Sequence, residues 1–164
     1  MKEITLTQGK TAKVDDKTFH LFGNITWAAC FTGTASKRPY AMHYQGLVGK
    51  KQQYLALHNA AWLAMTGKLP PKGYVIDHRD GDTLNNQLSN LRLASHAQNS
   101  YNRGVSRNSA TGVTGVTKRG DRYRAEIRSN GEHFFLGSFP TLSEAKAARA
   151  KKAYELWGEY ARQI

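Results

Sequence analysis

Residues 74–103 have the sequence YVIDHRDGDTLNNQLSNLRLASHAQNSYNR, and this stretch carries most of the information about the fold and its chemistry. Asp77 and His78 end an apolar run, and five asparagines follow before Arg103. Asparagine is a poor former of both helices and strands. The stretch is therefore either a long polar loop of hairpin type or a place where side-chain oxygens and an imidazole are gathered at one point.

The pattern around these residues predicts a strand, a loop, a second strand and a helix. GYVID (73–77) is a compact apolar run, and NLRLA (90–94) alternates leucine with other residues, as strands do. Ser95 suits the N-cap of a helix that extends to about Asn102.

Asp77 and His78 are adjacent on the first predicted strand, so their side chains leave it on opposite faces. One can bind a metal ion while the other faces a water molecule, and its near-neutral intrinsic pKa suits His78 for a general base. Asn90 begins the second strand, where its carbonyl oxygen could hold one imidazole nitrogen. Asn99 lies one turn into the helix and could be directed back at Asp77.

This constellation resembles the HNH nuclease family, and in particular the branch found in phage and intron-encoded homing endonucleases. The spacing is His78, eleven residues, Asn90, eight residues and Asn99, and the match covers about residues 55–103. The resemblance implies a ββα-metal fold in which His78 activates water, Asn90 orients His78, and Asp77 and Asn99 hold a divalent ion at the scissile phosphate. Because both ligands offer oxygen, Mg²⁺ or Mn²⁺ is expected rather than Zn²⁺.

For other polar residues near the motif, the sequence supports a role in the site less strongly. His96 shares the helical face of Asn99, so it is a possible extra metal ligand or phosphate contact. Asn85 and Asn86 are expected to hold the loop through side-chain hydrogen bonds to the backbone.

Two further histidines and a pair of acids are set aside. His43 and His58 fall in strand or helix patterns and are expected to be ordinary core or surface residues. Asp80 and Asp82 do not form a calcium loop, because no glutamate follows at the required position.

The amino-acid composition limits the classes of partner that the protein is expected to bind. The 164 residues suit one or two small domains, and 24 Lys and Arg against 12 Asp and Glu give a net charge of +12. Such an excess predicts a polyanionic partner, here double-stranded DNA, whereas a membrane surface is disfavoured because no long basic amphipathic helix is present. Cys30 is the single cysteine, which excludes an intramolecular disulfide and multi-cysteine zinc sites.

The expected location is the cytoplasm, of the host cell if the chain is phage-encoded. A single cysteine fits a reducing compartment. MKEITLTQGK at the start has no apolar core of signal-peptide length, and YLALHNAAWLAM is too short and too polar to span a bilayer.

The first fifty residues predict short strands broken by turns. TFHLFGNITWAACFTGT (18–34) and PYAMHYQGLVGKKQQYLAL (39–57) are rich in aromatic and β-branched residues. A helix is expected at Leu57–Met65 and ends at Gly67, where a left-handed cap is favoured.

A linker is predicted where the composition turns small and polar, and a second module follows it. Three strands are predicted at 112–119, 121–129 and 132–139, with turns at Gly120-Asp121 and Asn130-Gly131. A helix follows, because Thr141 and Glu144 form a capping box ahead of an alanine-rich run.

The middle strand of this module has two different faces. Tyr123, Ala125 and Ile127 are expected to pack on the helix. The opposite set forms a basic face that fits a DNA major groove, where arginine recognises guanine and glutamate accepts from cytosine; its members are Arg122, Arg124, Glu126 and Arg128.

Residues from about Gly112 to Ala161 resemble the AP2 DNA-binding domain through TGVTGV, AEIR, FFLGSF and the alanine-rich helix. The first strand carries fewer arginines than the plant members, so a target sequence is not implied. The resemblance implies DNA-facing positions at Thr117, Arg119, Glu126, Arg128, His133 and Phe135.

The sequence thus predicts an α+β protein with an HNH nuclease domain at 1–103 (core motif 55–103), a linker at 104–111 and an AP2-like domain at 112–164. The N-terminal part is strand-rich and leads into the ββα-metal module, and the C-terminal domain is a three-stranded antiparallel sheet plus one helix. We expect a metal-dependent homing-type DNA endonuclease that acts as a monomer and nicks one strand of an asymmetric site. The alternative is a non-catalytic, sequence-specific DNA-binding regulator with a decayed nuclease fold.

Overall fold

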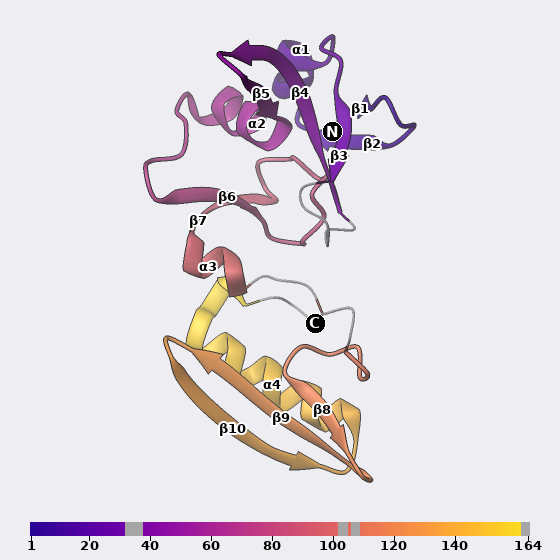
Figure 1. Cartoon of the computed structure of the whole chain (residues 1–164), viewed down its shortest axis with the longest axis vertical. Coiled ribbons are helices and arrows are strands. Elements are labelled where there is room, and N and C mark those ends of the chain that lie inside the picture. Colours follow the sequence, from indigo (N-terminus) through magenta and orange to yellow (C-terminus); the bar gives the residue numbers. More distant parts are fainter. Residues whose placement is uncertain (32–37, 102–104, 106–108, 162–164) are drawn as a thin grey trace. The chain divides into compact units, whose positions relative to one another are not determined.

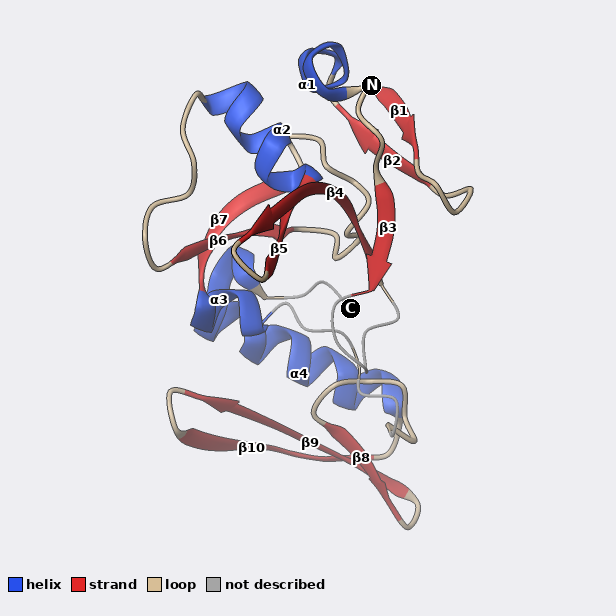
Figure 2. Ribbon diagram, turned by 45° about the horizontal axis from the view of Figure 1, so that its top comes forward, coloured by secondary structure: helices blue, strands red, loops and turns tan. Residues whose placement is uncertain are grey.

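The chain divides into two units, Met1–His96 and Ala97–Ile164, and each is described on its own. The structure is a computed structural model that describes residues 1–31, 38–101, 105 and 109–161. Figure 1 labels the helices and strands along the chain, and Figure 2 distinguishes them by type. The architecture is mixed α+β and rich in strands, as the sequence predicts.

The first unit begins with an antiparallel hairpin, which is followed by a short helix and a strand. These elements are β1 (Lys2–Thr5), β2 (Thr11–Val14), α1 (Asp16–Phe22) and β3 (Ala28–Phe31). Alternate hairpin residues, Ile4, Ala12 and Val14, are buried against the fully buried indole of Trp27. The alternation of the strands thus supplies one wall of the main core of this unit.

Helix α1 corrects the expectation of strands from residue 18 onward. Asp16 lies in its first turn, where a carboxylate complements the helix dipole, and Thr18 is fully buried. Seven residues are too few for the helical period to stand out from an aromatic run, and packing against α2 (Leu57–Thr66) selects the helix.

A long hairpin completes the first sheet and leads directly into α2. β4 (Pro39–Val48) and β5 (Lys51–Ala56) pair antiparallel, and the strand order is β3-β4-β5. Helix α2 ends at Gly67, which has φ 73° and donates its backbone N–H to the carbonyl of Leu63 at 2.8 Å. The predicted helix and its left-handed cap are confirmed.

The predicted strand–loop–strand is present as β6 (Tyr74–His78) and β7 (Leu91–Ser95), and α3 (His96–Tyr101) follows. Ile76 and Leu91 are buried with Ala61 of α2, so the hairpin is fixed beneath that helix. The antiparallel register places His78 opposite Leu91.

The second unit is a three-stranded antiparallel sheet with one long helix across one face (Figure 2). Asn130 and Gly131 have φ 52° and 84°, as the predicted Asn-Gly turn requires. The side chain of Thr141 accepts a hydrogen bond from the backbone N–H of Glu144 at 3.2 Å, so the predicted cap forms. The elements are β8 (Val116–Arg119), β9 (Arg122–Ser129), β10 (Glu132–Phe139), α4 (Leu142–Trp157) and the 3₁₀ turn η1 (Gly158–Tyr160).

The first strand of this sheet begins at Val116 rather than at the predicted residue 112. The division between the two units falls within α3, between His96 and Ala97. Residues 104 and 106–108 of the predicted linker lie outside the described residues. Within the described ranges, no helix is long and apolar enough to cross a lipid bilayer.

Candidate functional site: a buried Asp-His pair and an exposed basic sheet face

His78 lies at the end of β6 and is buried, with 4% of its surface exposed. Its Nε2 lies 3.2 Å from Oδ1 of Asn86, which is itself 1% exposed. The amide nitrogen of Asn86 donates to the carbonyl of Leu84 at 3.1 Å, which fixes Oδ1 on the side of the imidazole. Since an amide oxygen only accepts, this contact places the His78 proton on Nε2 and the lone pair on Nδ1.

The position of Asn86 is set by the N-terminal hairpin, far away in sequence. The backbone N–H of Asn86 donates to the carbonyl of Lys13 at 2.8 Å, and the N–H of Lys13 donates to the carbonyl of Leu84 at 2.8 Å. Residues 84–86 thus lie along the edge of β2 like an added strand. The first fifty residues therefore position the site as well as filling a core.

Asn90 has a different role from the predicted one. Its amide nitrogen donates to Oδ1 of Asp80 at 2.9 Å and to the carbonyl of Asn85 at 2.8 Å, and its oxygen accepts from the N–H of Asp80 at 3.1 Å. Asn90 therefore closes the loop between β6 and β7, while Asn86 meets the imidazole. The two asparagines exchange the roles that the sequence suggests for them.

Asp80 is the centre of the same loop. It accepts from the amide of Asn85 at 2.8 Å and from the backbone N–H of Asp82 at 2.8 Å, in addition to Asn90. Burial raises the pKa of Asp80, but the three hydrogen bonds together outweigh it, so the pKa lies below its ordinary value. The carboxylates of Asp80 and Asp82 thus hold the loop closed through hydrogen bonds.

His58, which the sequence predicts to be an ordinary core or surface residue, is a neighbour of His78. It lies in the first turn of α2, and its ring meets that of His78 edge to face, with centroids 5.5 Å apart and an interplanar angle of 89°. Tyr40 of β4 completes the group, with its ring centroid 5.7 Å from His58 and 6.3 Å from His78. The available signal is a single histidine near the start of a helix whose buried residues are all apolar, whereas His58 itself is half-buried.

Burial controls the protonation of this ring cluster of Tyr40, His58 and His78. Burial, with a smaller effect of neighbouring His78, lowers the pKa of His58 to about 3. Burial also lowers the pKa of His78, against the opposing effects of the Asn86 hydrogen bond and nearby carboxylates. Burial and Asp77 raise the pKa of Tyr40. At neutral pH both imidazoles are therefore uncharged and the phenol is protonated.

His43 lies apart from this cluster and fits the structural role expected of it. Its Nδ1 is 3.0 Å from the carbonyl of Thr26, and its ring centroid is 5.9 Å from that of Trp27.

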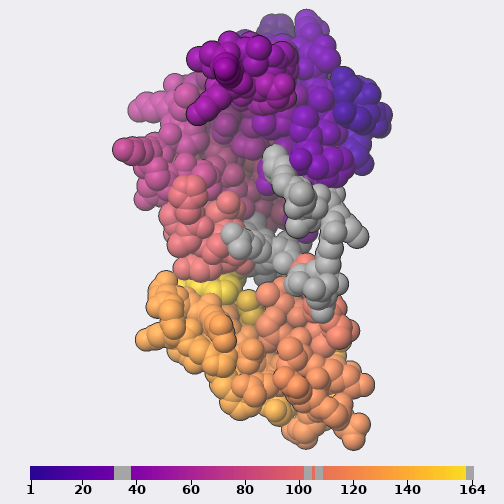
Figure 3. All heavy atoms as spheres, viewed as in Figure 1, coloured from indigo at the N-terminus to yellow at the C-terminus, as the bar shows by residue number. Residues whose placement is uncertain are grey.

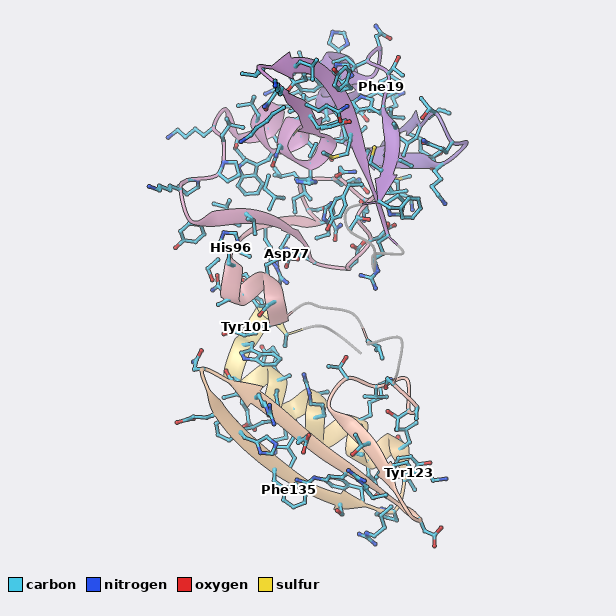
Figure 4. The ribbon with its side chains drawn as sticks, in the orientation of Figure 1. Phe19, Asp77, His96, Tyr101, Tyr123 and Phe135 are labelled. Carbon is cyan, nitrogen blue, oxygen red and sulfur yellow. The ribbon has the colours of Figure 1, made fainter. Side chains whose placement is uncertain are left out.

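Asp77 points to the other face of β6 and is paired with Arg92 of β7. Nε and the second guanidinium nitrogen of Arg92 lie 2.9 and 2.6 Å from Oδ2 of Asp77. Arg92 is 5% exposed and Asp77, which Figure 4 labels, is 6% exposed. Two opposite charges buried this close neutralise each other. Asp77 and His78 thus have different partners, as expected for adjacent residues of a strand: Asp77 contacts the guanidinium of Arg92, and His78 contacts the amide of Asn86.

The predicted metal ligands are Asp77 of β6 and Asn99 of α3, and the structure pairs the first of them with Arg92. Asp77 is neutralised by Arg92, and the described residues contain no group of three or more His, Cys, Asp or Glu side chains that could hold an ion. Asn99 is exposed on α3 and belongs to the second unit, so its pairing with Asp77 stays a prediction. His96 is also exposed, at the start of α3.

The sheet of the second unit brings the predicted DNA-facing residues to one exposed face. Ala125 and Ile127 are buried beneath α4 and Tyr123 is half-buried, as predicted. In Figure 3, strands β9 and β10, in orange, present the opposite face. The cross-strand register makes neighbours of Thr117 and Arg124, Arg119 and Arg122, Arg128 and His133, and Glu126 and Phe135.

Glu126 organises the centre of this face. Its Oε2 lies 3.2 Å from Nε of Arg124 and 3.3 Å from Nε2 of His133. The guanidinium of Arg124 also lies over the ring of Phe135, 4.8 Å from its centroid, and Phe135 (labelled in Figure 4) is 57% exposed. The carboxylate of Glu126 thus contacts both the guanidinium of Arg124 and the imidazole of His133 and holds the two side chains on this face.

Together the fold and the site define an α+β protein with an Asp-His pair on a ββ hairpin. Residues 55–101 match the model of the HNH endonuclease family. The chain is 36% identical over 125 residues to "Uncharacterized HNH endonuclease L560" of Acanthamoeba polyphaga mimivirus, covering 76% of this chain and 62% of that protein. It is 36% identical over 116 residues to "Protein 3.8" of Escherichia phage T7, covering 68% of this chain and 94% of that protein.

Residues 55–101 are thus similar to an HNH endonuclease domain, and a relative that matches over 125 residues carries that name. This chain spans less than two thirds of the mimivirus relative. No solved structure matches it significantly.

Proposed function

We propose that this protein is a DNA endonuclease in which neutral His78 is the general base. The observation that carries the proposal is the contact of Nε2 with Asn86, which directs the lone pair of Nδ1 away from the amide. Nδ1 takes a proton from a water molecule as the water oxygen attacks phosphorus. The bond from phosphorus to the 3′ oxygen breaks, and that oxygen leaves with the bonding electrons and takes a proton from a second water molecule. His58 and Tyr40 shield the imidazole and keep it uncharged.

Dependence on Mg²⁺ or Mn²⁺ is part of the proposal, because the family model that matches residues 55–101 is that of HNH endonucleases, which generally use a divalent metal. Asp77 and Asn99 are the proposed ligands, and Asp77 would have to exchange Arg92 for the ion. An ion would neutralise charge on the phosphate. In the described state Asp77 is paired with the guanidinium of Arg92, so the proposed step uses only His78 and water.

The exposed face of the C-terminal sheet is the proposed DNA-binding surface, in the manner of AP2 domains. Its support is the alignment of arginines, His133 and Phe135 on one face of a chain with net charge +12. The proposal also includes a homing-type specificity. It further includes a monomer that nicks one strand of an asymmetric site, because one His78 per chain attacks one phosphodiester at a time.

The test is incubation of the protein with Mg²⁺ or Mn²⁺ and supercoiled plasmid that carries DNA from its own genomic neighbourhood, sampled early. Open circles that precede linear DNA, and that EDTA suppresses, are expected. Linear DNA as the first product, with a dimer in light scattering, would contradict the nickase. Specific binding without any cleavage in either metal would favour the regulator instead. Cleavage that persists in EDTA would remove the metal from the mechanism.

A further inference from the structure

The second unit contains a cavity of about 340 Å³ that the proposed function does not use. It lies where α3, α4 and the loop before β8 meet the second half of β9. β8 pairs with β9 only from Arg122 to Ala125, so the stretch beyond Ala125 extends past that pairing. Among the residues that line the cavity are Tyr101, Thr114, Glu126, Arg128, Arg149 and Trp157.

Arg149 of α4 brings a buried charge to this cavity. It is 7% exposed, and among the described residues its Nε has no hydrogen-bond partner and its guanidinium has no carboxylate within ion-pair distance. The carboxylate of Glu126 is engaged by Arg124 and His133 instead. Burial lowers the pKa of Arg149, and no opposite charge offsets that effect. Unpaired buried charges are costly and rare in folded proteins.

A second unsatisfied donor lies in the same cavity. Oγ1 of Thr114 is buried and, within the described part of the chain, has no hydrogen-bond partner. Gly115 beside it has φ 72°, and a Cβ there would come within 3.0 Å of Nε of Arg149 and would clash with the backbone oxygen of Glu126. Glycine therefore keeps the space next to the guanidinium open.

One wall of the cavity is aromatic. The rings of Tyr101 and Trp157 are stacked, with centroids 4.4 Å apart and an interplanar angle of 2°. Nε1 of Trp157 donates to the hydroxyl of Ser129 at 2.9 Å, and the guanidinium of Arg149 lies 5.1 Å from the Trp157 centroid. This cation–π contact orients Arg149, but it supplies no acceptor for the guanidinium N–H groups.

We propose that this cavity binds a phosphate group, with the guanidinium of Arg149 and the hydroxyl of Thr114 as its donors. The planar fork of arginine matches two oxygens of a phosphate, and the hydroxyl reaches a third. Two otherwise unsatisfied buried donors are then explained by one ligand. The phosphate belongs to nucleic acid, to a free nucleotide or to inorganic phosphate, and the test distinguishes these sources. None of the residues that line the cavity belongs to the ring cluster of Tyr40, His58 and His78.

The test uses the full chain and three variants. Arg149→Met removes the charge at similar volume, Thr114→Val removes the hydroxyl, and Lys151→Met removes an exposed charge of the same helix as a matched control. Binding is measured by calorimetry with inorganic phosphate, adenosine monophosphate, and a short duplex with and without a 5′-phosphate. Thermal melts are run with phosphate and with chloride at equal ionic strength.

Saturable binding of at least one phosphate ligand is expected for the parent chain and for Lys151→Met. Arg149→Met should weaken it at least tenfold, and Thr114→Val severalfold. Phosphate should raise the melting temperature of the parent but not of Arg149→Met, whose ligand-free melting temperature should equal or exceed that of the parent. Tight binding of the 5′-phosphorylated duplex alone assigns the site to nucleic acid ends, and binding of the small ligands assigns it to free phosphate.

Two results would overturn the proposal. One is the absence of saturable binding of every probe to the parent chain. The other is a ligand-free melting temperature of Arg149→Met that lies below that of the parent, together with an equal rise of both melting temperatures on adding phosphate. That result would make Arg149 a structural residue held by Trp157.

Discussion

Oδ1 of Asn86 lies 3.2 Å from Nε2 of His78, and this contact selects the imidazole tautomer. The amide comes from a loop that the edge of β2 fixes by main-chain hydrogen bonds. The proposed base is therefore oriented by a residue eight positions away and supported by a hairpin some seventy positions away.

Asn86→Ala and Asn90→Ala should distinguish the residue that orients the His78 imidazole from the residue that closes the loop between β6 and β7. Asn86→Ala should slow single-turnover cleavage by about 10- to 100-fold, because a histidine that loses its orienting partner loses its tautomer preference. Asn90→Ala should instead lower the free energy of unfolding by about 2–3 kcal/mol, because three loop hydrogen bonds are lost. Cleavage assays and urea unfolding measure both quantities. A larger catalytic loss in Asn90→Ala would restore the role that the sequence suggests for it.

Arg92→Met should destabilise the first unit by about 3–5 kcal/mol, since it leaves the carboxylate of Asp77 buried without its partner. The double variant Asp77→Asn/Arg92→Met should recover much of this loss. Urea unfolding followed by fluorescence in a Trp157→Phe background reports the first unit, because the two remaining tryptophans, Trp27 and Trp62, lie there. A single variant within 1 kcal/mol of the parent would show that the buried pair contributes little.

Stability of the first unit should fall on acidification. The pKa of His58 is about 3 in the folded chain and near 6.5 unfolded, so the unfolded chain binds more protons between these values. Stability is thus complete above pH 6.5 and is lost as the pH falls, by about 2.5 kcal/mol from this group between pH 7.5 and 4.5. His58→Phe should reduce the loss by that amount. An unchanged pH dependence in His58→Phe would mean that the buried His58 ring accepts protons readily.

Arg119→Ala should weaken DNA binding with little effect on turnover at saturating DNA, because the residue lies on the exposed sheet face of the second unit. Each lost phosphate contact should also reduce the slope of log K against log salt by about 1. Lys151→Ala on α4 is the control, since it removes one positive charge from a different surface. Equal affinities of the two variants would show that overall charge, and not this face, binds DNA.

The sequence predicts the elements with a strong local signal and misses those that depend on tertiary contacts. β6, β7, α2 and the second unit follow from alternation, caps and an Asn-Gly turn, all of which are local. Helix α1 is too short for its period to appear in an aromatic run. Whether Asn86 or Asn90 contacts His78 depends on where the twelve-residue loop, residues 79–90, meets β2. A periodic sequence pattern does not reveal such a tertiary contact. His58 belongs to the site only because α2 packs on the β6–β7 hairpin.

The most direct test of the account is the single-turnover cleavage rate of His78→Ala on saturating DNA, measured together with its affinity. His20→Ala, which removes an exposed histidine of α1, is the matched control. General-base catalysis contributes about 10²- to 10⁴-fold, so His78→Ala should lose at least about 100-fold in rate while its affinity stays within about twofold of the control. A His78→Ala protein that cleaves DNA at the rate of His20→Ala would contradict the assignment of His78 as the base.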